Sequence, residues 1–251
     1  MTIRIATLGA LLGAALIATP AAAEQVFAWD FETAPTLGTF PVAGYSLTNA
    51  GGTVTGAQNL GPPPVGYPAA GFGTTFFQNT TSNLTLLTLT GLGAHSSLTV
   101  AFDIAFIDTW DGIAGDDYLY VTADGAPLLT LSSDHWLGGG SQYEGGELVG
   151  VGPYYRDLGS DDDYNYPDAV YHYGGLAVLT FAHTAPTFSL GFQAGGTGWQ
   201  GDANPWDESY GVDNISISAA AVPEPASWGL MLLGFGGLGA VLRSRRRIAL
   251  A

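Results

Sequence analysis

The sequence contains no cysteine and no lysine, and all six of its positive charges are arginines. Without cysteine the chain has no disulfide framework and no thiolate to serve as a nucleophile or a metal ligand. Arg156 is the one cation between residues 24 and 222. Binding to nucleic acid depends on lysine and arginine to neutralise phosphates, so nucleic acid is excluded as a partner.

Several enzyme signatures are missing as well. There is no Gly-x-Ser-x-Gly elbow and no glycine-rich phosphate loop before a helix, and the four histidines do not have zinc-ligand spacing. What the chain has instead is acid: 22 Asp and Glu residues give a net charge of −16. A chain this acidic needs salt or bound cations to remain compact, and divalent metal is the natural counter-charge.

Residues 1–23 have the three parts of a secretory signal peptide. Arg4 supplies the positive region, an apolar run extends from Ile5 to Ile17, and three alanines end at Ala23. This pattern predicts cleavage before Glu24 and export from the cytoplasm. An uncleaved N-terminal anchor is the alternative.

The C-terminal segment, residues 222–251, begins with a Pro-Glu-Pro motif and contains an uncharged stretch that precedes an arginine cluster. The stretch from Ala226 to Leu242 has 17 residues. As a helix it would be about 25 Å long, at the short end of what crosses a bilayer. The pattern predicts a single transmembrane helix with its basic end in the cytoplasm. Its five glycines weaken such a helix and allow another helix to approach closely.

This segment resembles the PEP-CTERM sorting signal of exopolysaccharide-producing Gram-negative bacteria. The resemblance rests on seven residues, namely Pro223, Glu224, Pro225, Arg243, Arg245, Arg246 and Arg247. It implies recognition and cleavage by an exosortase, a membrane-embedded cysteine peptidase. An ordinary membrane anchor is the alternative. We therefore expect the protein to be anchored in the membrane, on the cell surface or in the extracellular matrix.

The intervening residues 24–221 predict one all-β domain, because their apolar residues recur with a period of two. Roughly nine or ten short strands separated by Gly, Pro, Asn and Asp favour a two-sheet β-sandwich, and a jelly roll in particular. The clearest strand is Leu98–Ile107, and Asp124-Gly125 predicts a hairpin turn. We also expect a hairpin around Pro186, and the first strand (Val26–Glu32) beside the last (Tyr210–Ser218).

An acidic, glycine-containing loop follows the Leu98–Ile107 strand. Four carboxylates lie within ten residues there: Asp108, Asp111, Asp116 and Asp117. Many oxygen ligands on a tightly turning backbone suit calcium, although the spacing is not that of an EF-hand. A solvated acidic loop is the alternative.

A second candidate calcium site joins the two ends of the domain. Asp213 is in register with Ile215 and Ile217, so its carboxylate would face the core and need a partner. Asp-Phe-Glu in the first strand and Val-Asp-Asn-Ile in the last resemble jelly-roll carbohydrate-binding and adhesion domains. That resemblance implies that Glu32 and Asp213 hold a structural calcium. Alternatively, Asp213 hydrogen-bonds to backbone at a strand end.

A long segment from Ser132 to Gly175, predicted to be irregular, is rich in tyrosine and acid. Aromatic faces beside polar groups can grip sugar rings, and the candidate ligand-binding residues are Trp136, Tyr164, Tyr166 and Trp206. Packing of these rings as a small core of their own is the alternative.

Three functions follow from these features. The first is a non-catalytic surface or matrix protein associated with polysaccharide and holding structural calcium. The second is an extracellular glycan-acting enzyme that uses the carboxylates of the aromatic segment. The third is a purely structural adhesion protein.

Overall fold

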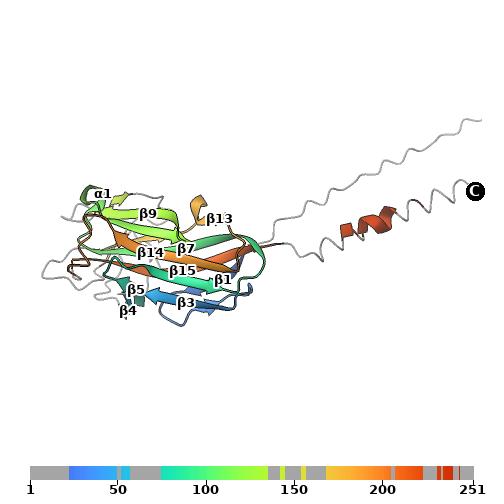
Figure 1. Cartoon of the computed structure of the whole chain (residues 1–251), viewed down its shortest axis with the longest axis horizontal. Helices are drawn as coiled ribbons and strands as arrows, with labels where there is room; N and C mark the ends of the chain where they lie inside the picture. Colours follow the sequence, from blue (N-terminus) through green and yellow to red (C-terminus); the bar gives the residue numbers. More distant parts are fainter. Residues whose placement is uncertain are drawn as a thin grey trace, which may run out of the picture.

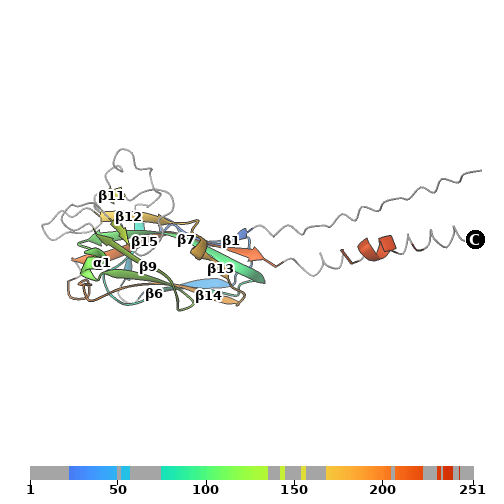
Figure 2. The same ribbon diagram turned by 90° about the horizontal axis from the view of Figure 1, so that it is seen from above.

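The structure of the protein is a computed structural model. It describes residues 23–49, 52–56, 75–134, 142–144, 154–156, 168–204, 207–222, 231–232, 234–239 and 243. The described strands form an elongated sandwich (Figures 1 and 2), and Ala23, where the first strand begins, pairs with Ala220 near the end of the last strand. Within the described residues, 231–232, 234–239 and 243 are helical, and no helix has the length and apolar character needed to cross a bilayer. The predicted signal peptide lies outside the described residues, except for Ala23.

The described strands form two antiparallel sheets, which confirms the two-sheet all-β prediction. The nine-stranded sheet has the order β11 (Tyr154–Arg156), β12 (Asp168–Tyr173), β7 (His95–Asp108), β15 (Glu208–Ala221), β1 (Ala23–Trp29) and β2 (Thr36–Leu37). It also includes β13 (Thr180–Ala182) beside β7, β5 (Thr75–Asn79) beside β15, and β4 (Gly52–Gly56) beside β5.

The second sheet has six strands. Their order is β10 (Gln142–Glu144), β9 (Ala126–Asp134), β8 (Tyr118–Ala123), β14 (Thr187–Gly195), β6 (Thr85–Thr90) and β3 (Gly44–Asn49). A one-turn helix α1 (Gly112–Gly115) precedes β8, and a 3-10 helix η2 (Ala177–Leu179) precedes β13.

The core lies between the sheets, and β7 is its central strand. Alternate residues of β7 are completely buried, as the sequence predicted: Leu98, Val100, Phe102, Ile104 and Phe106. The Phe102 ring meets Phe192 of the opposite sheet edge to face, with ring centroids 5.2 Å apart. Aromatic packing of this kind joins the two sheets.

The long central strand β15 pairs with β7 on one side and with β1 on the other. This confirms that the first and last strands are neighbours. A bulge lies between Asp213 and Ser216, where Asn214 has φ 48°. The extra residue shifts the alternation, so Val212 and Ile215 belong to the core while Asp213 does not share their face. The predicted common face of Asp213, Ile215 and Ile217 is therefore wrong.

Other predicted elements fare differently. Asp124 and Gly125, both with positive φ, form the predicted hairpin turn between β8 and β9. The predicted hairpin around Pro186 is wrong, because β13 pairs with β7 whereas β14 pairs with β6 and β8 of the other sheet. Within the segment predicted as irregular, β12 is a regular strand. Its Tyr171 and Tyr173 are fully buried in the core, as in the packing alternative.

Candidate metal centre

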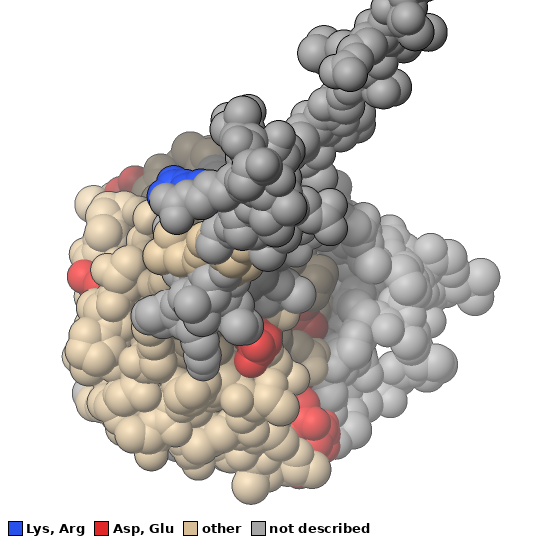
Figure 3. Space-filling model, turned by 90° about the vertical axis from the view of Figure 1, so that its right-hand side faces the viewer, with Lys and Arg blue, Asp and Glu red and all other residues tan. Residues whose placement is uncertain are grey.

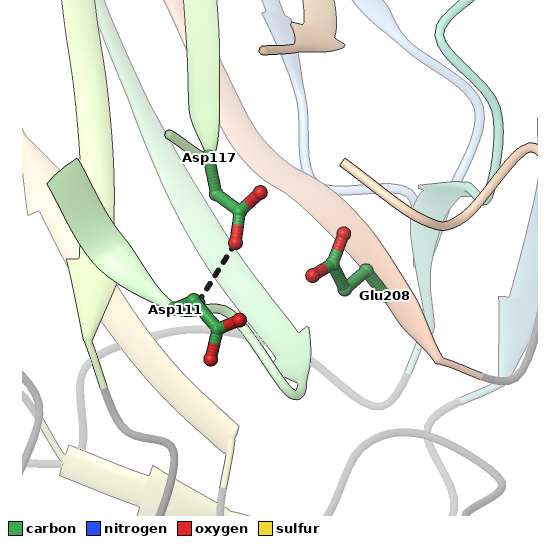
Figure 4. Close-up of side chains that lie close together, drawn as sticks. All are labelled: Asp111, Asp117 and Glu208. Atoms are coloured by element: carbon green, nitrogen blue, oxygen red, sulfur yellow. Dashed lines mark hydrogen bonds between the residues drawn. The ribbon is translucent and has the colours of Figure 1, made fainter. Parts of the chain in front are cut away.

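Three carboxylates from separate parts of the chain converge at the α1 end of the sandwich. Asp111 precedes α1, Asp117 lies between α1 and β8, and Glu208 is the first residue of β15. Each offers an oxygen within 4.8 Å of the other two (Figure 4). Asp117 and Glu208 have no exposed surface, whereas Asp111 is half-buried. This is the one group of three such ligands among the described residues.

A tight backbone turn brings Asp111 and Asp117 together. Gly112, the first residue of the helical turn, and Asp116, the residue that follows its last, both adopt positive φ, at 72° and 65°. The reversed chain lets the Asp111 backbone N–H donate to Asp117 Oδ2 at 2.9 Å. Gly198 packs against this turn so closely that a Cβ there would lie 2.4 Å from Asp117 Oδ1. Only glycine fits at that position without a shift of the turn.

Each buried carboxylate has one oxygen held and one oxygen free. Asp117 Oδ2 accepts the Asp111 N–H, and Glu208 Oε2 accepts the backbone N–H of Gln200 at 2.7 Å. Asp117 Oδ1 and Glu208 Oε1 are buried and accept no hydrogen bond from an N–H or O–H group, although the Asp117 and Glu208 side chains lie close enough to share a proton. Buried oxygens without partners are rare. Fixing one carboxylate oxygen while leaving the other open is how proteins orient metal ligands.

The pKa values of the three acidic side chains are raised, because the side chains are close to other carboxylates and shielded from water. Burial raises the pKa of Glu208 to about 9, and repulsion from Asp117 and Asp207 adds to this shift. Burial also raises the pKa of Asp117 to about 6. The pKa of Asp111 is raised by burial and by the charges of Asp134 and Asp207. The repulsion between these carboxylates is reduced either by a proton shared between Asp117 and Glu208 or by a bound cation.

The donor set fits a hard divalent cation. Oxygens up to 4.8 Å apart match opposite ligands of Ca²⁺, whose Ca–O distances are about 2.4 Å. All three side chains present carboxylate oxygen, the ligand type that Ca²⁺ and Mg²⁺ prefer.

The structure separates the four carboxylates that the sequence had grouped. Asp111 and Asp117 belong to the cluster. Asp116 Oδ2 instead accepts hydrogen bonds from the Thr197 backbone and hydroxyl, which lower the Asp116 pKa. Asp108 has φ 68° and pairs with Glu208 across the β7–β15 ladder, but it is not part of the cluster. Glu208 was missed because only this long-range strand pairing brings it to the loop.

The second predicted calcium pair lies outside the cluster. Glu32 Oε1 accepts the Thr75 backbone N–H at 2.7 Å, and Asp213 Oδ1 accepts the N–H of Asn214 at the same distance. These contacts match the alternative in which Asp213 hydrogen-bonds to backbone. The candidate ligand-binding residues and most of the sorting residues lie outside the described residues; they are Trp136, Tyr164, Tyr166, Trp206, Pro223, Glu224, Pro225, Arg245, Arg246 and Arg247.

Comparison with known proteins identifies the C-terminal segment. Residues 221–247 match the PEP-CTERM protein-sorting motif. The chain carries a PEP-CTERM sorting tail. This tail indicates an exported protein that an exosortase processes and that resides at the cell surface or outside the cell. It begins at the last residue of β15, at the end of the sandwich opposite α1 (Figure 1).

Curated proteins gave no match to this chain. Among solved structures, the CBM22-1 xylan-binding domain of Paenibacillus barcinonensis Xyn10C is 11% identical with a TM-score of 0.32, over 82% of this chain and 100% of that one. The CBM2 module of the evolved Dit of Lactobacillus casei BL23 phage J-1 is 14% identical with a TM-score of 0.34, over 82% and 100%. Similarity this low does not identify a ligand for the β-sandwich domain.

Proposed function

We propose that the protein is a non-catalytic surface or matrix component whose sandwich holds one structural Ca²⁺ between Asp111, Asp117 and Glu208. The observation that carries the proposal is the pair of buried, unpartnered oxygens, Asp117 Oδ1 and Glu208 Oε1. A cation between them would join the α1 turn to the first residue of β15. Because only the folded chain assembles these ligands, the ion would stabilise the fold.

The cation site would face away from the membrane in this proposal. β15 runs from Glu208 at the site to Ala221 at the sorting tail. At about 3.3 Å per residue, a strand of this length separates the two by roughly 45 Å. A tail held in the membrane by a C-terminal helix, before or without cleavage, would therefore present the α1 end outward.

Extracellular polysaccharide is the partner that we propose for this outward end. Trp136, Tyr166 and Trp206 are each two residues from a described residue near it, namely Asp134, Asp168 and Glu208. Asp134 forms a bridge with Asp111, and Asp168 begins β12. Aromatic residues this close in sequence to acidic residues are of the types that bind a hydroxyl-rich ligand.

Glycan hydrolysis is the competing function, since Glu208 has the raised pKa of a general acid. A glycosidase needs two carboxyl groups that reach the bond between two sugars. Asp117 and Glu208 are both fully buried, so neither side chain is exposed to such a substrate. Their burial supports a structural ion instead.

The test is the thermal midpoint of the full chain in detergent, with excess EDTA and with excess Ca²⁺. At a free Ca²⁺ concentration 100 times the dissociation constant, the ion adds about 2.7 kcal/mol. In a domain of this size that raises the midpoint by about 5–10 °C.

Glu208→Gln should abolish most of that response, whereas Glu24→Gln, at an exposed position of β1, should keep it. A midpoint that is equal in EDTA and Ca²⁺ would remove the ion from the proposal. Binding to polysaccharide is measured separately, by affinity electrophoresis of the native chain and of Trp206→Ala. Unchanged mobility in neutral and acidic glycans would remove the glycan partner.

A further inference from the structure

The outer face of the six-stranded sheet is uncharged in a chain that is otherwise acidic. β3, β6, β8 and β14 contain no charged residue, although the chain has 22 Asp and Glu residues. The side chains that point away from the core on these strands are mostly threonine, serine, glutamine and tyrosine. At the tail-side end, too, the acids of the described surface gather in a few small patches (Figure 3). A partner of the sheet face therefore meets hydroxyl and amide groups but no charge.

Two tyrosines lie on this face at the α1 end of β8. The ring centroids of Tyr118 and Tyr120 are 5.9 Å apart, and the ring planes are inclined by 32°. Tyr120 is 38% exposed. A Cβ at Gly195 of β14 would lie 3.5 Å from Tyr120 Cε2, so the ring reaches over a residue that has no side chain. The neighbouring strand therefore leaves the Tyr120 ring uncovered at this point.

Polar side chains flank the Tyr120 ring on both neighbouring strands. Gln193 of β14 and Thr130 of β9 are both directly opposite Tyr120 in the ladder. Gln193 Nε2 donates to the Ser82 carbonyl at 3.0 Å, which fixes the amide and leaves its oxygen to accept from a ligand. The three residues extend across three strands, or about 10 Å. An open ring between hydroxyl and amide groups can pack against the C–H face of a sugar and hydrogen-bond to its hydroxyls.

Charge distinguishes the kinds of partner that this face can bind. None of the six strands of the sheet contains lysine or arginine. The charged residues near its α1 end are acids, among them Asp116 next to α1 and Asp134 at the end of β9. An acidic glycan would be repelled by these carboxylates, and so would a second copy of this chain, which has the same net charge of −16. A neutral glycan avoids this repulsion.

We propose that Tyr118, Tyr120, Gln193 and Thr130 form a platform that binds a neutral polysaccharide. This inference rests on the proposed function, because it specifies where on the sandwich the polysaccharide binds and which charge class it belongs to. One sugar unit stacks on Tyr120 and hydrogen-bonds to Gln193 and Thr130, and the next unit reaches Tyr118.

The platform is attached to the loop of the candidate metal centre. Asp117, one of the three candidate ligands, directly precedes Tyr118. Thr197 and Tyr118 both donate hydrogen bonds to the Asp116 side chain, and these bonds lower the Asp116 pKa. The position of the Tyr118 ring is therefore fixed by the same turn that carries the acids.

The test is affinity electrophoresis of the full chain in detergent, with gels that contain a β-glucan, a galactomannan or an arabinoxylan, and with hyaluronan as the acidic probe. The native chain should be retarded by at least one of the neutral glycans. Tyr120→Ala should weaken that binding by about tenfold or more, whereas Tyr120→Phe, which keeps the ring, should stay within about threefold of the native affinity. Higher salt should leave the affinity unchanged, because no ion pair contributes to it.

Tyr45→Ala is the matched control. Tyr45 is 41% exposed and lies on β3 of the same sheet, but its ring packs against Phe27 and Trp29. This variant should bind like the native chain. A second measurement uses a soluble oligosaccharide of the retarding glycan, which should shift the ring NMR signals of Tyr120 and leave those of Tyr45 in place.

The outcomes separate this platform from the proposed function. If Tyr120→Ala binds a neutral glycan as tightly as the native chain, the platform is overturned while a glycan partner still stands. Retardation by hyaluronan alone would overturn the neutral charge class. A native dimer in light scattering that Tyr120→Ala converts to a monomer would assign the face to a second copy instead. A native chain that no glycan retards would overturn both the platform and the glycan partner.

Discussion

Calcium binding at the Asp111–Asp117–Glu208 cluster should displace about one proton at pH 7.5. The Asp117–Glu208 pair, with pKa values raised to about 6 and about 9, holds about one proton at that pH. A metal ligand must be deprotonated, so the ion and the Glu208 proton compete for the same oxygen. Binding should therefore depend on pH far above the ordinary range of a carboxyl group.

The direction and the size of this pH dependence follow from the linkage between proton binding and Ca²⁺ binding. A carboxyl group whose pKa is raised on folding stabilises the ion-free fold below its unfolded pKa and loses that contribution as pH rises toward the folded value. The Ca²⁺ dissociation constant should move the opposite way and fall by about tenfold per pH unit between pH 6 and pH 9. Above pH 9 it should level off, because no proton remains to be displaced.

Calorimetric titration at pH 7.5 in two buffers with different ionisation enthalpies measures the proton directly. The difference between the two heats, divided by the difference in buffer enthalpies, should give about one proton released per ion. Glu208→Gln should release none and bind weakly, while Glu24→Gln should behave like the native chain. Tight binding with no proton release would refute the assignment of Glu208 as a ligand held protonated by its surroundings.

Three further substitutions probe the site and the fold. Asp116→Asn should lower the thermal midpoint slightly, because it weakens the contacts with Thr197, but it should keep the full Ca²⁺ response; loss of that response would return Asp116 to the ligand set. Gly198→Ala should lower the unfolding free energy in urea by roughly 2 kcal/mol, because its Cβ would meet Asp117 Oδ1 and the Gly115 carbonyl oxygen. An unchanged unfolding free energy would show that the turn moves aside without cost. Phe102→Ala should lower that free energy by about 3–5 kcal/mol, because it empties the contact between the sheets, and a loss under 1 kcal/mol would contradict its central place.

The sequence predicted those parts of the fold that local patterns determine. Alternation placed β7 and its buried face correctly, because a strand between two layers must be apolar at every second residue. Asp124-Gly125 predicted its turn because few residues accept positive φ at both central positions. The bulge at Asn214 has no comparable local signal, and one extra residue there moved Asp213 off the core face. The pairing of β13 was missed for a similar reason, since three residues hold too little pattern to choose between sheets.

The candidate site, too, was predicted only in the part that a local sequence pattern determines. Asp111 and Asp117 were predicted as ligands because they share one short loop, whereas Glu208 enters through the pairing of β15 with β7, about a hundred positions away in sequence. β15 also connects the two ends of the sandwich, from Glu208 to Ala221. Its first residue would hold the ion, and its last residue pairs with His95 where the sorting motif begins. If the two ends are independent, Glu208→Gln will leave deuterium uptake at Val222 unchanged. If the strand transmits strain, Glu208→Gln will change that uptake as well.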